Sequence, residues 1–275
     1  MLKHALIAAV VGVLSAGCSS TYGERGGDVA RSAANATRGA VNRAGDEFDE
    51  TLASFKKPDD LVVADPFEPF NRAMYSFNTG VDKVLLGPAA NVYETVVPQF
   101  GRSRVRDFID NLKSPVWFAN DVFQGDFDHA GVTAQRFALN TTVGVLGVYD
   151  YAAHHADLPK RDEDFGQTLG VHGVGNGPYL MLPLYGPTTL RDFGGTLVDI
   201  ALDPLTWAEF EGDTAFRATT RTLDIVDIRV QTQPAIEVVR ESVDPYAQAR
   251  ALYVQNRNDR ISNGEGTYDD LPEFE

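Results

Sequence analysis

The stretch "DPFEPFNRAMYSFNTGVDKVL", residues 65–85, has the pattern of an amphipathic helix. Asp65 is a favourable N-cap, and Pro66 suits the first helical position because a donor there would have no partner. The apolar residues then recur every three or four positions, as one face of a helix requires. They are Phe67, Phe70, Met74, Phe77, Val81 and Val84. We therefore expect a helix to begin close to Asp65.

Similar patterns recur along most of the chain, and regular strand alternation is scarce. In "SPVWFANDVF", residues 114–123, Ser114 is a candidate N-cap and Pro115 a candidate first helical residue. Further stripes with helical spacing run on both sides of Pro245. Their members are Phe216, Thr219, Leu223, Val226, Val230, Ile236, Val239, Val243, Tyr246, Ala249 and Tyr253. These patterns predict an all-α fold.

One apolar segment, residues 136–153, carries no formal charge between Arg136 and Asp150 but contains Gly144 and Gly147. It is too short and too polar for a transmembrane helix, which needs about 20 apolar residues. Each glycine costs a helix about 1 kcal/mol, so the pair indicates a hinge or a close backbone approach. Two interpretations stay open: a buried core helix with a kink, and a hairpin that dips into lipid.

A second unusual segment, residues 165–195, is rich in glycine and proline. Three of its glycines have the spacing of a phosphate-binding loop, but no Lys-Ser or Lys-Thr follows, and Pro178 stands where the cradling helix should begin. We expect no helix interior here. The pattern favours an extended apolar ribbon between two turns that enters a helix near Thr188 or Thr189.

The only cysteine, Cys18, follows a positively charged start, a short apolar run and two small residues. This arrangement is typical of an export signal. The stretch "LSAGCSS" resembles a bacterial lipobox, although Ser15 stands where leucine is commonest. A lipobox predicts a diacylglycerol on Cys18, and Ser19 after it favours the outer membrane over the inner one. A plain secretory signal with a stray cysteine is the alternative.

The composition divides the rest of the chain. Residues 1–17 are the expected signal peptide, and residues 18–64 are a lipidated N-terminus and polar tether. Within the tether, residues 41–57 have the spacing of a short amphipathic helix, which either rests on the membrane or packs on the domain. Residues 65–260 are the expected helical domain, and residues 261–275 are an acidic tail.

The formal net charge of −15 excludes nucleic acid as a partner, because an acidic protein repels phosphate backbones. No G-x-S-x-G or H-E-x-x-H motif is present, and serine is sparse in the domain. Adjacent helical residues such as His154 and His155 point in different directions and rarely share a metal ion. The sequence therefore favours a protein that is not an enzyme and carries no metal or cofactor.

Several motifs occur in an order that resembles one known family. They are "DPFEPFNRAMYSFN" (65–78), "QGD" (124–126), "RFALNTTVG" (136–144), "FGQTLGVHGVGNGPYLMLPLYGPTTLRD" (165–192) and "DPYAQAR" (244–250). Together they resemble the MlaA (VacJ) outer-membrane lipoproteins over roughly residues 65–260. The glycine- and proline-rich segment is the most specific of these motifs.

The resemblance implies a ring of amphipathic helices in the inner, periplasmic leaflet of the outer membrane, beside a trimeric porin. It further implies a lipid conduit that removes mislocalised phospholipids from the outer leaflet and so maintains lipid asymmetry. A periplasmic carrier would then take each lipid to an ABC transporter in the inner membrane. A structural lipoprotein that scaffolds the envelope without transport is the alternative.

The resemblance also implies roles for single residues. Gly144 and Gly147 match the hinge of the family's pore gate, and Phe77 and Asn78 match the first-helix motif near the pore. Asn71 lies seven residues before Asn78 and hence on the same side of a helix. We therefore expect Asn71 and Asn78 to line the pore, with Phe77 packing beside them. The other interpretation is that both asparagines merely meet solvent.

Overall fold

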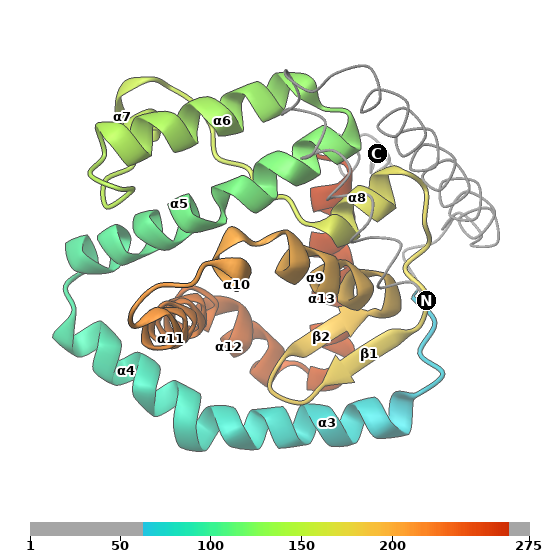
Figure 1. The fold of residues 1–275 in the computed structure, drawn as a ribbon. Helices are drawn as coiled ribbons and strands as arrows, with labels where there is room; N and C mark the ends of the chain where they lie inside the picture. The colour runs from blue at the N-terminus through green and yellow to red at the C-terminus, as the bar shows by residue number, and fades with distance from the viewer. Residues whose placement is uncertain (1–62, 264–275) are drawn as a thin grey trace, which may run out of the picture. The chain divides into compact units, whose positions relative to one another are not determined.

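The computed structural model describes residues 63–263 (Figure 1). The elements in chain order are α3 (Glu68–Val81), the π-helical turn η1 (Asp82–Leu86), α4 (Gly87–Val96), α5 (Gln99–Gln124), α6 (Phe127–Thr142), α7 (Tyr151–His155), α8 (Phe165–Val171), β1 (Tyr179–Leu182), β2 (Gly186–Thr189), α9 (Leu190–Leu202), α10 (Pro204–Trp207), α11 (Asp213–Gln231), α12 (Gln233–Glu241) and α13 (Pro245–Ile261). The predicted signal peptide, Cys18 and nearly all of the tether and of the acidic tail lie outside the described residues, while Val63, at the end of the predicted tether, packs in the core of the domain.

The all-α prediction is confirmed, because the sole sheet of residues 63–263 is the two-stranded hairpin of β1 and β2. Its antiparallel register pairs Tyr179 with Thr189 and Leu182 with Gly186. The Thr189 side chain then accepts a hydrogen bond from the Asp192 N–H and caps α9. The predicted ribbon that enters a helix near Thr189 is therefore correct.

Two predicted helix starts are wrong. α3 begins at Glu68, with Pro69 in its first turn, and Asp65 does not cap it. α5 does not begin at Ser114 but runs through Pro115, whose missing N–H leaves the Asn111 carbonyl without a helical donor. We attribute this continuity to the packing of α5 along α6, which offsets the loss.

The glycine-rich segment also contains a helix that the composition argued against. α8 covers Phe165–Val171, and the Asp164 carboxylate caps it by accepting from the Gln167 N–H at 2.9 Å. Its glycines serve packing: a Cβ built on Gly195 of α9 would lie 2.3 Å from the Gly166 nitrogen. Only glycine lets these two helices approach so closely, and this gain outweighs its low helix propensity.

The helices of the described domain pack mainly with their neighbours in sequence, and later helices join earlier ones (Figure 1). α5 and α6 form a helical hairpin, and α8 packs on α9. α11 contacts both α4 and α5, while α13 contacts α8, α12 and β2. The β-hairpin lies against α3 and α13, so the two ends of the described chain meet around it.

The hydrophobic core of residues 63–263 is small. Its main cluster is formed by Val63, Tyr179, Met181, Tyr246 and Val254. Many of the most deeply buried side chains are polar instead. They include Asn71, Asn120, Asp121, Glu163, Gln167, Thr188 and Thr189, which are at most 2% exposed.

Large apolar side chains are correspondingly exposed. On α3, the predicted apolar stripe faces outward: Phe67, Phe70 and Phe77 are about half exposed, while the buried residue of this helix is Asn71. Apolar side chains are also exposed on α4, α9 and α11. The orientation of α3 is the reverse of that of an amphipathic helix in a water-soluble domain, whose apolar face is buried. Exposed apolar surface on this scale indicates contact with a membrane or a partner.

Candidate functional site

A partly open cavity of about 680 Å³ is lined by residues of α3 and η1, the β-hairpin and its turn, α12 and α13. Most of its lining is apolar, including Leu86, Ile236, Val239 and Leu252. The same wall carries the polar and charged side chains of Asn78, Asp82, Arg240, Asn256 and Arg260. The cavity is therefore amphipathic, and its size is that of a typical small-molecule site.

Asn78 holds the hairpin against α3 at the cavity wall. Its side-chain amide donates to the Leu182 carbonyl at 2.9 Å, and its carbonyl accepts from the Leu184 N–H at 2.8 Å. Leu184 lies in the turn and has a left-handed φ of 64°, which an L residue rarely adopts without support. Both hydrogen-bonding groups of Asn78 therefore fix the turn that forms one side of the cavity.

The structure places Asn71 and Phe77 away from this lining. Asn71 is fully buried; its amide donates to Asp65 at 2.7 Å and to the Tyr179 carbonyl at 3.1 Å, and its carbonyl accepts from the Met181 N–H at 2.9 Å. It thus ties α3 to β1, a task that the seven-residue spacing does not reveal. Phe77 is 49% exposed on the outer side of α3.

Gly144 and Gly147 lie in the turn that follows α6, at residues 143–149, and not in the cavity wall. The kinked core helix is wrong for these residues, because α6 ends at Thr142 and Val145 and Leu146 are exposed. A Cβ on Gly144 would lie 2.1 Å from the Tyr149 carbonyl oxygen. Gly147 has a φ of 89°, and a Cβ on it would lie 2.3 Å from the Asn111 Cβ of α5. Both glycines permit close backbone approach, and a hinge motion stays a prediction.

The charged part of the cavity wall centres on Asp82. Its Oδ1 accepts from Arg229 Nε at 2.5 Å, and its Oδ2 accepts from Arg229 at 3.1 Å and Arg240 at 2.7 Å. Two guanidinium groups therefore share one carboxylate. These contacts join η1 to α11 and α12, which lie far from it in the sequence.

The comparisons with known proteins agree with this architecture. The family model described as MlaA lipoprotein matches residues 63–260. The chain belongs to the MlaA lipoprotein family.

Curated relatives of the same family cover the same region. The Escherichia coli (strain K12) protein named "Intermembrane phospholipid transport system lipoprotein MlaA" is 39% identical over 204 residues, which cover 73% of this chain and 79% of that protein. A protein of the same name from Haemophilus influenzae is 35% identical and covers 73% of this chain and 80% of its own length. A solved structure described as "Structural basis for maintenance of bacterial outer membrane lipid asymmetry" has a TM-score of 0.64 at 34% identity, covering 72% of this chain and 99% of that chain.

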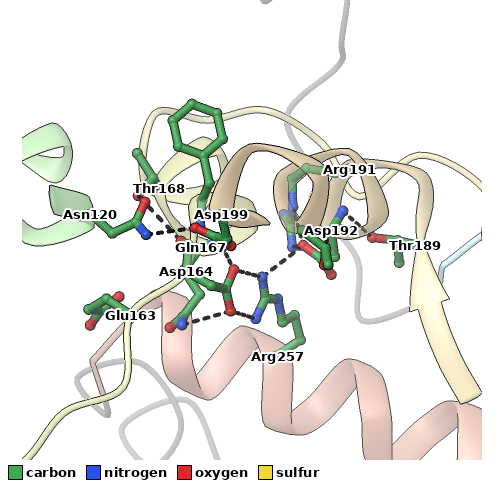
Figure 2. A network of polar contacts seen from close by, with 12 residues as sticks. Asn120, Glu163, Asp164, Gln167, Thr168, Thr189, Arg191, Asp192, Asp199 and Arg257 are labelled. Atoms are coloured by element: carbon green, nitrogen blue, oxygen red, sulfur yellow. Dashed lines mark hydrogen bonds and ion pairs between the residues drawn. The ribbon is translucent and has the colours of Figure 1, made fainter. Parts of the chain in front are cut away.

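In this MlaA-family chain, a buried polar network joins α13 to α8 and α9 (Figure 2). Arg257 of α13 donates to Asp164 at 2.5 and 2.6 Å and to Asp192 at 3.1 Å. Arg191 also donates to Asp192, at 2.8 Å. Burial raises the pKa of Asp164, but the hydrogen bonds and charge of Arg257 outweigh it and leave the pKa below its ordinary value. The pKa of Asp192 is likewise low, since Arg257 and Arg191 outweigh its burial.

Asp199 on α9 differs from Asp164 and Asp192 in the direction of its pKa shift (Figure 2). It accepts from the Asn120 amide at 2.9 Å and from the Phe165 N–H at 3.1 Å, and no arginine of residues 63–263 forms an ion pair with it. Burial raises its pKa to about 6, and the two hydrogen bonds only partly oppose this rise. The network therefore contains a carboxyl group whose pKa lies well above its ordinary value.

The sequence interpretation missed most cavity residues on α12 and α13. The positions on α13 that face the cavity are Ala249, Leu252, Tyr253, Asn256 and Arg260. Ala249 and Tyr253 belong to the predicted stripe of helical spacing, but Leu252, Asn256 and Arg260 share no pattern with it, so the sequence indicated no site here. In the described part of the chain, no helix combines the length and apolar character needed to cross a membrane. The same residues contain no group of three or more His, Cys, Asp or Glu side chains placed to hold a metal ion.

Proposed function

We propose that this chain is a non-enzymatic conduit that takes mislocalised phospholipids from the outer leaflet of the outer membrane and passes them to a periplasmic carrier. The names of its relatives, which describe a lipoprotein of an intermembrane phospholipid transport system, support this function. The single observation that carries it is the amphipathic cavity between α3, the β-hairpin, α12 and α13.

The chemistry of the cavity suits a phospholipid, which has an ionic head and two apolar tails. Moving the head through a wholly apolar passage would leave its charges unpaired, at a cost of many kcal/mol. Arg240 and Arg260 offer that head polar contacts, while Leu86, Ile236 and Leu252 offer apolar contacts to the tails. Such a passage needs no catalytic nucleophile, and the sequence contains neither of the hydrolase motifs G-x-S-x-G and H-E-x-x-H.

The outer surface supports a location within the outer membrane. The exposed apolar side chains of α3 and α4 would be buried by lipid tails in the periplasmic leaflet, which stabilises the protein there. A lipid anchor on Cys18 would hold the chain permanently, because three acyl chains bind far more tightly than one. The helices would then surround the passage as a ring, with the turn at Gly144 and Gly147 acting as its gate.

The proposal includes partners that the fold alone does not identify. A trimeric porin beside the protein would hold it at the depth where it meets the outer leaflet. A periplasmic lipid carrier of the Mla type would accept each lipid and deliver it to an inner-membrane ABC transporter. The names of the relatives support a multi-component system of this kind.

The test is to purify the protein in detergent, wash it extensively and quantify the phospholipid released by organic solvent. Ala235 of α12 lines the cavity, whereas Val238 of the same helix is exposed and does not. Ala235→Trp should reduce the bound phospholipid to a small fraction of the wild-type amount, and Val238→Trp should leave it unchanged. Equal amounts in both variants would favour a scaffolding lipoprotein whose bound lipid only coats the outer surface.

A further inference from the structure

The cavity wall carries an excess of positive charge, which is unusual in this chain. The whole sequence has a formal net charge of −15, yet the charged side chains of the lining are two arginines, Arg240 and Arg260, and one carboxylate, Asp82. Arg229 adds a further positive charge directly behind Asp82. An excess of arginine at an otherwise apolar cavity points to an anionic ligand group.

Asp82 is already paired with two arginines, which makes it a poor partner for a cationic ligand group. Both of its oxygens already accept hydrogen bonds, from Arg229 on one side and from Arg229 and Arg240 on the other. Two positive charges face this single negative charge. An ammonium group in the cavity would therefore meet no free carboxylate in the lining and would be repelled by the arginines.

The two cavity arginines keep donors for a ligand. Arg240 uses one nitrogen for Asp82, and its side chain is 37% exposed, so most of its five N–H donors remain available. Arg260 is exposed, and no ion pair or side-chain hydrogen bond joins it to another residue in the described chain. Planar guanidinium groups match the geometry of phosphate oxygens.

We propose that Arg240 and Arg260 bind the phosphate of the transported lipid and make the cavity prefer anionic phospholipids, such as phosphatidylglycerol, over zwitterionic ones. This inference rests on the proposed transport function and adds a substrate preference to it. The apolar lining receives the acyl chains, so a phosphate without tails binds weakly. The preference comes from the missing carboxylate partner for a headgroup amine, as well as from the arginines themselves.

Fluorescence anisotropy tests this with the mature protein in dodecylmaltoside and a fluorescently labelled dihexanoyl-phosphatidylglycerol as the probe. The competitors are unlabelled dihexanoyl-phosphatidylglycerol, dihexanoyl-phosphatidylethanolamine, dihexanoylglycerol and sn-glycerol 3-phosphate. We expect phosphatidylglycerol to compete about tenfold better than phosphatidylethanolamine, because the ethanolamine ammonium is repelled by the arginines and finds no free carboxylate in the lining. Dihexanoylglycerol and glycerol 3-phosphate should compete more weakly than either.

Variants assign the preference to the two arginines. Arg260→Gln should remove most of the tenfold preference, Arg260→Lys should keep part of it, and Arg240→Gln should act in the same direction. Arg221→Gln is the matched control, because Arg221 is 62% exposed on α11 and does not line the cavity. It should behave as the wild type does.

The other outcomes separate this inference from the proposed function. If the labelled lipid does not bind the wild-type protein at all, the proposed function fails together with the inference. If dihexanoylglycerol competes as well as phosphatidylglycerol, or Arg260→Gln keeps the wild-type order of competitors, lipid binding stands and the phosphate assignment is overturned. If glycerol 3-phosphate competes as well as the lipid, the arginines bind a water-soluble anion, and the lipid assignment is overturned.

Discussion

Replacing Arg257 by methionine tests whether the network in Figure 2 holds α13 to α8 and α9. The Arg257 residue is 9% exposed and donates to Asp164 and Asp192. Methionine keeps a long side chain but removes the charge and all the hydrogen bonds. The change therefore leaves two carboxylates without their shared partner at the junction that supports the cavity from behind.

The expected loss of stability depends on which hydrogen-bond and charge partners Asp164 and Asp192 keep when Arg257 is removed. Removing one partner of a buried ion pair costs about 3–5 kcal/mol. Asp192 keeps Arg191 at 2.8 Å, and the Asp164 side chain is 34% exposed, so water can solvate it. We therefore expect the lower end, about 3 kcal/mol, which lowers the Tm of a domain of this size by about 6–12 °C.

The pH dependence provides a second, independent readout. Burial raises the pKa of Asp164 and Asp192, but the arginine contacts lower it more, so both carboxyl groups have depressed pKa values in the folded wild type. Such groups stabilise the fold above their unfolded pKa of about 3.9 and lose this contribution as the pH falls through the folded pKa. Without Arg257, burial dominates and these carboxyl groups protonate more readily. The difference between wild type and variant should therefore be largest near neutral pH and shrink as the pH falls toward about 4.

Thermal unfolding in a non-ionic detergent, followed by circular dichroism, measures both effects. Arg221→Met is the control, because Arg221 is 62% exposed and its pair with Asp203 contributes at most about 1 kcal/mol. An Arg257→Met variant that melts within about 2 °C of the wild type near neutral pH would refute the reasoning, given the shift expected for a buried pair. A Tm difference that does not change with pH would refute the assignment to the carboxylates.

Three further predictions concern other parts of the chain. Cys18→Ala should block acylation and leave the protein unprocessed or released from the outer membrane; unchanged fractionation of the variant, with no acyl label on the wild type, would contradict the anchor. A Gly144→Val, Gly147→Val double variant should impair removal of outer-leaflet phospholipid while porin association persists. The reason is that each new side chain would collide with the backbone or with Asn111. Normal lipid asymmetry in cells that carry the variant would count against a gate there. Burial raises the pKa of Asp199 to about 6, so its ionisation lowers the stability of the fold as the pH rises from about 4 to 6. Asp199→Asn should remove this pH dependence of the Tm. An unchanged dependence of Tm on pH in the variant would show that Asp199 is not its source.

The sequence predicted the helical class and the family well, because both depend on local signals. Helical spacing is visible in any amphipathic segment, whichever way its apolar face points. The direction of that face was not predictable: the α3 stripe of Phe67, Phe70 and Phe77 faces outward, and Asn71 is the buried residue. The usual rule that the apolar face of a helix is buried holds for a domain in water. An outward-facing apolar stripe can be predicted only when the tertiary packing is known.

The site was harder to predict than the fold. Asn78 lines the cavity, although its role in a pore stays a prediction, whereas Asn71 has fully satisfied hydrogen bonds under the hairpin. Arg240 and Arg260 come from two different helices and share no motif, so only tertiary contacts bring them to one cavity. The helix in α8 was missed because the benefit of Gly166 lies in its contact with α9, which local propensity does not report.

The central claim is that phospholipid passes through the cavity between α3, the hairpin, α12 and α13. Its most direct test is the amount of outer-leaflet phospholipid in cells that carry Ala235→Trp or Val238→Trp as the only copy, measured by digestion with an added phospholipase. Filling the cavity with Ala235→Trp should raise the digestible phospholipid to the level of cells that lack the protein, while Val238→Trp, on the exposed side of the same helix, should keep the wild-type level. A wild-type level in the Ala235→Trp cells, with the protein present in the outer membrane, would contradict passage through this cavity.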